Sequence, residues 1–328
     1  MHAANGSDAS LIAAVLLFLG LLLVVALTIA TELWWRRRQK VSASKALEGK
    51  TTAIAQRLRP IIPESHFVVV DNLKIHYLQA GRGRDVILLH GIGASVYVWR
   101  FIFPLLEKRF RVTAIDLPGF GKSHKDVRRD YGLDAQTALI GKTIKTMGLR
   151  DPILVGSSMG GAIALWLARS EPLRFKKVVA LAPATDSRLV PSSLQHFSPF
   201  SPLFRRTLNR KTMKLMLKRI ITKHSLITDE VVEAYLEPFL DRGDSVRTFW
   251  SALSLLADPR LPKDLSAVSA DVLVIYGERD LLVSRRSIDR LMKTLPHARL
   301  VLHRQAGHHI MEDEPEWLSE TIMTFLES

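Results

Sequence analysis

The pattern of apolar and polar residues divides the chain into an N-terminal apolar segment and a long region where short apolar runs alternate with helical patterns. Residues 11–30 are apolar or small and carry no charged side chain. Twenty residues at about 1.5 Å per residue span roughly 30 Å, the hydrocarbon thickness of a bilayer. Trp34 and Trp35 follow, and residues 36–40 then carry four basic side chains. This order predicts one transmembrane helix.

A cleaved signal peptide is the alternative interpretation of residues 11–30. The preceding residues contain no Lys or Arg, however, and the apolar run is longer than a usual signal core. We therefore predict an N-terminal segment with a membrane anchor over residues 1–35 and a basic juxtamembrane linker over residues 36–63. The basic residues after the anchor place the rest of the chain in the cytoplasm, by the positive-inside rule.

From residue 64 onward, short apolar runs bounded by turn residues predict strands. The first two runs flank Asp71-Asn72, a pair typical of a tight hairpin. Helical patterns such as residues 133–147 and 159–170 separate most of the later runs, and such alternation predicts a mostly parallel sheet covered by helices on both faces. The predicted strands are Phe67–Val70, Leu73–Leu78, Val86–Leu89, Val112–Ile115, Ile153–Val155, Val178–Leu181, Val272–Ile275 and Leu300–His303.

The alternation is interrupted once, between the strand that ends near Ala184 and the strand that starts at Asp271. The intervening stretch has helical patterning and is too long for a loop in a compact domain. We interpret residues 186–265, approximately, as an inserted helical cap. Within the cap, residues 203–221 combine basic and apolar side chains, which fits either a cap helix with a solvated face or a basic helix in a membrane interface.

The net charge of +14 is concentrated in two short stretches. Residues 36–59 contain eight basic residues and one acid, and residues 186–224 contain nine basic residues and one acid. Basic side chains next to a membrane helix set its topology and contact anionic headgroups, so the charge predicts a membrane partner and no nucleic acid. The chain has no cysteine, which excludes disulfides, thiolate metal sites and cysteine nucleophiles.

Residues 156–160 read G-S-S-M-G, a G-x-S-x-G motif between a predicted strand and a predicted helix. In that context the motif places a serine on a strained turn, with its hydroxyl exposed at the end of the sheet. Glycines flank the serine because the turn brings backbone segments too close together for a Cβ atom. We predict that Ser158 is a nucleophile and that the N–H of Met159, at the start of the helix, points toward the same space.

A serine nucleophile needs a base, and the base needs an acid to orient it. His308 and Asp280 each follow a predicted strand and therefore lie beyond its carboxyl end, where open α/β sheets place their sites. His309 is an alternative base, and Glu278 and Asp186 are alternative acids. We predict His308 because a glycine directly precedes it, and Asp280 because its loop can reach the imidazole.

A turn at residues 90–93, with the sequence H-G-I-G, follows the predicted strand Val86–Leu89. An acyl-transfer site needs N–H donors where the oxyanion develops. We predict that the N–H of Ile92 faces that of Met159 and forms such a site with it. A plain glycine-rich exit from the strand is the alternative interpretation.

These motifs, together with D-L-P-G-F-G-K-S at residues 116–123, resemble the α/β-hydrolase superfamily from about Phe67 to the C-terminus. The resemblance implies an α/β fold with eight strands, a helical cap after the sixth strand, and no cofactor or metal. It also implies a catalytic triad and two oxyanion donors. Asp313 departs from the pattern, because many relatives carry Glu there. The implied site residues are Ser158, Asp280 and His308 for the triad, and Ile92 and Met159 for the oxyanion donors.

A membrane helix joined to such a domain, here residues 64–328, is similar in layout to membrane-anchored monoacylglycerol lipases. Resemblance to epoxide hydrolases and haloalkane dehalogenases is weaker, because they use aspartate where this chain has Ser158. We therefore predict a membrane-anchored serine hydrolase that cleaves lipid or monoacyl esters. A hydrolase of carbon–carbon bonds or other small metabolites with the same triad is an alternative, and a non-catalytic scaffold is another.

Overall fold

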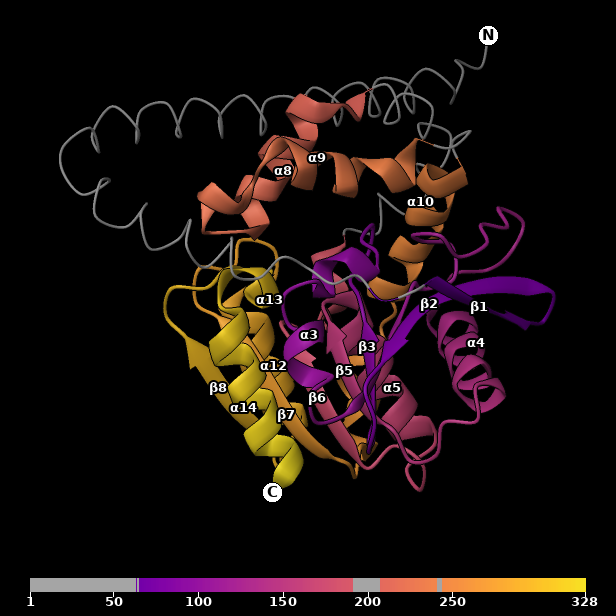
Figure 1. The fold of residues 1–328 in the computed structure, drawn as a ribbon. Coiled ribbons are helices and arrows are strands. Elements are labelled where there is room, and N and C mark those ends of the chain that lie inside the picture. Colours follow the sequence, from indigo (N-terminus) through magenta and orange to yellow (C-terminus); the bar gives the residue numbers. More distant parts are fainter. Residues whose placement is uncertain (1–62, 64, 191–206, 241–243) are drawn as a thin grey trace, which may run out of the picture. The chain divides into compact units, whose positions relative to one another are not determined.

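The computed structural model describes residues 63, 65–190, 207–240 and 244–328 (Figure 1). The chain divides into two units, residues 1–56 and residues 57–328, and every described residue belongs to the second unit. The predicted membrane helix at residues 11–30 lies outside the described residues. In the part of the chain that the structure describes, no helix is long and apolar enough to cross a bilayer.

The described residues form an eight-stranded sheet with the order β1-β2-β4-β3-β5-β6-β7-β8. β1 pairs with β2, and β2 with β4, in antiparallel fashion, whereas the remaining neighbours are parallel. The mostly parallel sheet is therefore confirmed. The strands are β1 (Ser65–Val70), β2 (Leu73–Ala80), β3 (Asp85–Leu89), β4 (Arg111–Ile115), β5 (Ile153–Ser157), β6 (Lys177–Leu181), β7 (Asp271–Gly277) and β8 (Arg299–His303).

The hairpin between β1 and β2 has the expected two-residue turn. Asp71 and Asn72 both have positive φ, 49° and 64°. Two successive positive φ values match the right-handed twist of the flanking strands, and Asp and Asn tolerate them better than most residues. Val70 consequently pairs with Leu73 across the turn.

Alternate residues of the parallel strands enter two different cores. In β3, Ile87 and Leu89 belong to one core, and Val86 and Leu88 belong to the other. This burial on both faces explains why the strands appear in the sequence as continuous apolar runs. The first core includes residues of α4 (Leu133–Thr146), α5 (Met159–Ser170) and α12 (Arg285–Thr294), and the second includes residues of α3 (Phe103–Leu106) and α14 (Pro315–Glu327).

The cap follows β6, as expected, and the chain returns to the sheet at β7 (Figure 1). Asn209 begins α8 with a capping box, in which its side chain accepts from the Lys211 and Thr212 N–H groups. Met213 and Leu217, four residues apart, form the buried underside of α8. The main cap helices are α8 (Arg210–Ile220), α9 (Asp229–Leu236) and α10 (Asp244–Leu256).

Candidate functional site

Ser158 lies on a sharp turn between β5 and α5. Its φ of 53° and ψ of −116° are strained for a residue with a side chain. A Cβ atom on Gly156 would lie 2.2 Å from the carbonyl oxygen of Gly160, and one on Gly160 would lie 2.1 Å from that of Leu89. The glycines of the motif are therefore required by close backbone contacts, as the sequence predicted.

The structure brings His308 and Asp280 together. The Nδ1 atom of His308 lies 2.7 Å from Oδ2 of Asp280, and both side chains are buried. The other carboxylate oxygen of Asp280 accepts from the N–H groups of Leu282 at 2.7 Å and Val283 at 2.9 Å. The carboxylate is thus held by its own loop, and a proton on Nδ1 leaves Nε2 of His308 as the free base.

The alternative base and acids are engaged elsewhere. His309 Nδ1 lies 2.9 Å from the hydroxyl of Tyr235. Asp186 accepts hydrogen bonds from Ser287 and Arg290, and these contacts, with Arg188, lower its pKa to about 2 against the effect of burial, which raises it. Glu278 is exposed. Of these candidates, His308 and Asp280 are the pair that the fold places in contact.

The predicted oxyanion turn lies directly against Ser158. A Cβ atom on Gly91 would lie 3.2 Å from the Ser158 Cβ and 3.8 Å from its Oγ. Within the described residues, neither Ile92 nor Met159 donates a backbone hydrogen bond, and Met159 has no partner inside its helix because it is the first residue of α5. Both N–H groups are therefore available to a ligand. The Ser158 hydroxyl itself has no hydrogen-bond partner among the described residues. A hydrogen bond between a nucleophile and its base is often long without substrate and tightens only when substrate binds.

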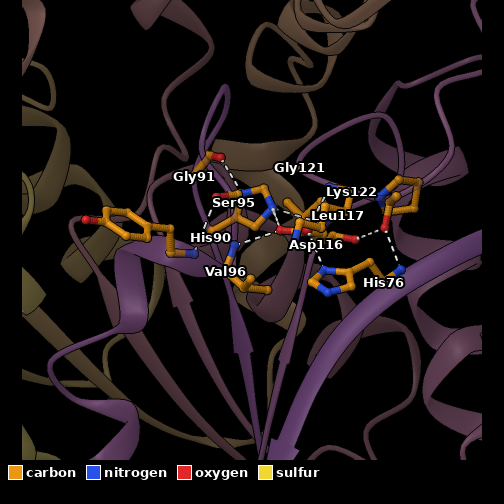
Figure 2. A network of polar contacts seen from close by, with 12 residues as sticks. His76, His90, Gly91, Ser95, Val96, Asp116, Leu117, Gly121 and Lys122 are labelled. Atoms are coloured by element: carbon orange, nitrogen blue, oxygen red, sulfur yellow. Dashed lines mark hydrogen bonds and ion pairs between the residues drawn. The ribbon is translucent and has the colours of Figure 1, made fainter. Parts of the chain in front are cut away.

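The His90 side chain hydrogen-bonds within this turn (Figure 2). Its Nε2 accepts from the N–H of Leu117 at 2.9 Å, so the ring proton sits on Nδ1 and is donated to the carbonyl of Gly91 at 2.7 Å. Burial lowers the pKa of His90, which keeps the imidazole neutral and holds this tautomer. His90 therefore has a structural part in the site, because it holds the residue that precedes Ile92.

Asp116 is the centre of the same network (Figure 2). Its carboxylate accepts from His76 Nδ1 at 2.7 Å, from the Val96 N–H at 2.7 Å and from the Lys122 N–H at 2.8 Å. Burial would raise the pKa of Asp116, but the His76 hydrogen bond and neighbouring donors lower it overall. Gly121, with a φ of 52°, is needed because its Cβ would lie 2.1 Å from Cγ of Asp116. Asp116, the first residue of the 116–123 motif, thus holds the start of the 3₁₀ helix η1 (Val96–Trp99) through the Val96 N–H. This helix follows the oxyanion turn.

A second buried network, which sequence reasoning missed, connects the cap to the histidine loop. Arg100 forms a two-pronged ion pair with Glu312 of α13 (Ile310–Asp313), at 2.8 and 2.9 Å. Tyr235 of α9 donates to the same carboxylate and contacts His309. Burial would raise the pKa of Glu312, but the charge of Arg100 and its hydrogen bonds lower that pKa to about 2. Arg100, Tyr235 and Glu312 are far apart in sequence, so no local motif predicts the network.

Asp313, the residue that departs from the family pattern, is fully buried, and both of its carboxylate oxygens accept hydrogen bonds. One carboxylate oxygen accepts from the N–H groups of Thr222 at 2.8 Å and Lys223 at 3.0 Å. The other accepts from the Gly307 N–H at 2.8 Å. Aspartate, although shorter than the glutamate of many relatives, therefore links Thr222, after α8, to Gly307, just before His308.

A cavity of about 640 Å³ lies between β2, η1 and the cap. Its lining includes His76, Tyr97, Phe103, Lys122 and Pro238. Ser158, Asp280 and His308 do not line it. No group of three or more metal-ligating side chains occurs within the described ranges.

The sequence of residues 86–315 matches the profile of a single protein family, described as the alpha/beta hydrolase fold. The chain belongs to the α/β-hydrolase superfamily. The match covers more than half of the chain and includes the strand before the oxyanion turn, the Ser158 elbow, the cap and the His308 loop. The chain is accordingly a hydrolase by family, with the expected fold.

Two relatives illustrate the range of this superfamily. The chain is 30% identical over 258 residues to the uncharacterized hydrolase YugF of Bacillus subtilis, covering 76% of this chain and 92% of the relative. It is also 30% identical over 265 residues to a 2-hydroxy-6-oxononadienedioate/2-hydroxy-6-oxononatrienedioate hydrolase of Burkholderia vietnamiensis, covering 77% and 91%.

Solved structures agree on the fold. A bacterial membrane phospholipase A matches with a TM-score of 0.68 at 24% identity, over 95% of this chain and 97% of that chain. A meta-cleavage product hydrolase, CumD, matches with a TM-score of 0.69 at 24% identity, over 81% and 98%. At these identities the likeness shows the fold alone.

Proposed function

We propose that this chain is a membrane-anchored serine hydrolase that cleaves carboxylic esters of lipid or monoacyl type. The observation that carries the proposal is the buried His308–Asp280 contact of 2.7 Å. Asp280 follows β7 at the same edge of the sheet at which the strained Ser158 turn follows β5, because the two strands run parallel. A serine on such a turn, with a base held by an acid, is the arrangement that activates a hydroxyl for attack on a carbonyl.

In the proposed reaction, Ser158 Oγ attacks the ester carbonyl while Nε2 of His308 takes the hydroxyl proton. Asp280 stabilises the resulting imidazolium through its contact with Nδ1. The N–H groups of Ile92 and Met159 bind the oxyanion, and each such donor contributes about 3 to 4 kcal/mol in comparable sites. His308 then protonates the leaving alcohol, and water releases the acyl group by the same steps in reverse order.

Aromatic cap residues support an apolar acyl group. A Cβ atom on Gly93 would lie 3.0 Å from the ring of Phe249 and 3.3 Å from that of Phe239, so both rings border the oxyanion turn. The two rings meet edge to face, with their centroids 6.3 Å apart. Apolar walls with a few placed polar groups are typical of sites for hydrophobic ligands.

A carbon–carbon bond hydrolase is the second candidate, favoured by the 30% identity to the dienedioate hydrolase. That relative's substrate, by its name, carries two carboxylates, which call for cationic partners. Among the described residues, Arg100 is a buried cation, and its guanidinium is already neutralised by Glu312, which Tyr235 of the cap also contacts. This pairing supports the ester over a dianionic substrate.

The membrane anchor rests on the apolar run at residues 11–30 and the basic residues after it. In this proposal the helix holds the catalytic domain on the cytoplasmic side of the membrane.

The test is hydrolysis of a p-nitrophenyl ester series, from acetate to palmitate, by the detergent-solubilised full chain. We expect the rate to peak at medium or long acyl chains and to vanish in Ser158→Ala. Ser157→Ala is the matched control, because it removes the neighbouring hydroxyl and leaves the elbow in place. Activity confined to acetate would favour the small-metabolite alternative, and no turnover by folded protein at any length would contradict the ester proposal.

A further inference from the structure

Two adjacent leucines project into solvent directly after Asp280. The side chains of Leu281 and Leu282 are 69% and 52% exposed. Single exposed leucines are ordinary on protein surfaces, but adjacent ones form a patch that water solvates poorly. The patch directly follows the proposed catalytic acid in the sequence.

The leucines are held outward by an ordered loop. The N–H groups of Leu282 and Val283 both donate to Asp280 Oδ1, and the Asp280 N–H donates to the Gly277 carbonyl at 3.0 Å. Val283 is buried, and its carbonyl accepts from the Tyr276 hydroxyl at 3.0 Å. The loop therefore cannot fold its leucines inward without breaking the contacts that orient Asp280.

Arginines flank the leucines. Arg279 and Arg286 are exposed, and neither has an acidic partner among the described residues. Arg285, between them in sequence, is paired with Asp289 at 2.8 Å. Apolar side chains bordered by unpaired cations are the combination that favours an anionic lipid surface, since the headgroups attract the charges while the acyl region takes up the leucines.

The loop borders the residues that carry the proposed base. The N–H of Arg279 donates to the carbonyl of Ala306 at 3.0 Å, two residues before His308. A Cβ atom on Gly277 would lie 2.4 Å from the carbonyl oxygens of Ala306 and Gly307, so the two segments are in close contact. A membrane surface in contact with this loop would therefore lie close to the segment that carries His308.

We propose that residues 279–286, here named the Leu281 loop, dock on the anionic lipid–water interface and insert Leu281 and Leu282 into it. The proposal rests on the proposed function, in which the substrate is a lipid ester. The linker at residues 36–63 could reach at most about 90 to 100 Å when fully extended, so an anchored domain can bring this loop to the membrane. Because tethering makes the contact intramolecular, a small apolar patch suffices.

The absence of cysteine in the chain allows a direct test. A polarity-sensitive thiol fluorophore is attached to Leu281→Cys in the full-length Ser158→Ala protein, reconstituted in phosphatidylcholine vesicles with or without phosphatidylglycerol. Leu173→Cys is the matched control, because Leu173 is 86% exposed and follows α5 at the opposite end of the sheet. Brominated lipids quench a fluorophore that enters the acyl region.

We expect a blue-shifted emission and several-fold stronger quenching at position 281 than at position 173 in vesicles with phosphatidylglycerol. Arg279→Gln with Arg286→Gln should remove most of that difference. Equal quenching at the two positions would overturn the proposal, and so would a blue shift at position 281 that depends on protein concentration in detergent, because it would indicate a second copy. The readout involves no turnover, so a failed ester assay and a failed docking assay are separate results.

Discussion

The buried Arg100–Glu312 pair predicts an unusual pattern of stability changes. The exposed fractions of the two side chains are 3% and 0%. Removing one partner leaves the other charge buried and uncompensated, which costs about 3 to 5 kcal/mol in comparable proteins. We therefore expect Glu312→Leu and Arg100→Met each to lower the free energy of unfolding by about that amount.

The pKa of Glu312 points in the same direction. Burial alone would raise it, but the charge of Arg100 and the hydrogen bonds to the carboxylate lower it to about 2, so the folded state favours the ionised form. The double variant Arg100→Met/Glu312→Leu removes both charges, so its remaining cost is the lost hydrogen bonding of Tyr235 and His309, about 1 to 3 kcal/mol.

The assay is equilibrium urea unfolding of the full chain, followed by the fluorescence of its six tryptophans. Glu327→Gln is the control, because Glu327 forms an exposed ion pair with Arg109 and should change the free energy of unfolding by less than about 1 kcal/mol. The reasoning is refuted if the single variants at Arg100 and Glu312 cost no more than this control. It is also refuted if the double variant costs the sum of the two.

Three further predictions follow from named contacts. Folding lowers the pKa of Glu312, so its carboxylate stabilises the folded state fully above about pH 4.5 and loses this effect as the pH falls toward 2. The difference in free energy of unfolding between wild type and Glu312→Gln should therefore shrink over that pH range, measured by urea titrations at each pH. Gly160→Ala places a Cβ atom against the Leu89 backbone and should abolish accumulation of folded protein, whereas Gly148→Ala, which meets nothing within 4 Å, should cost only about 1 kcal/mol by thermal unfolding. Asp313→Asn turns an amide toward a backbone donor, so we expect a loss of about 2 kcal/mol and a lower kcat with an unchanged KM for a soluble ester. An unaltered kcat would show that the link to Gly307 does not position His308.

Much of the fold follows from local sequence signals. The parallel strands are buried on both faces, so they stand out as short apolar runs, and α5 begins at Met159 and ends at Ser170 as predicted because a glycine-rich turn precedes it. The positions of Ser158, Asp280 and His308 could be predicted, because each follows a strand at the same edge of the sheet. The contact of His308 with Asp280, and of His309 with Tyr235, follows from three-dimensional packing.

The buried support of the site was not predictable from spacing. Arg100 directly follows η1, Tyr235 lies in the cap and Glu312 lies in the histidine loop, so the three meet only after the cap docks on the sheet. In the sequence Asp116 stands out only as part of a family motif, although its carboxylate accepts three hydrogen bonds. Burial of a charge depends on tertiary contacts, which no local pattern of apolar and polar residues specifies.

Labelling with a fluorophosphonate tests the central claim, that His308 activates Ser158, most directly. Mass spectrometry of the digested full chain should find the label on the peptide that contains Ser158, and Ser158→Ala should remain unlabelled. His308→Gln should slow labelling by about 100-fold or more, since a general base contributes that much, whereas His309→Gln should stay within about tenfold of wild type. A label on another residue, or a rate that depends on His309 and not on His308, would contradict the account.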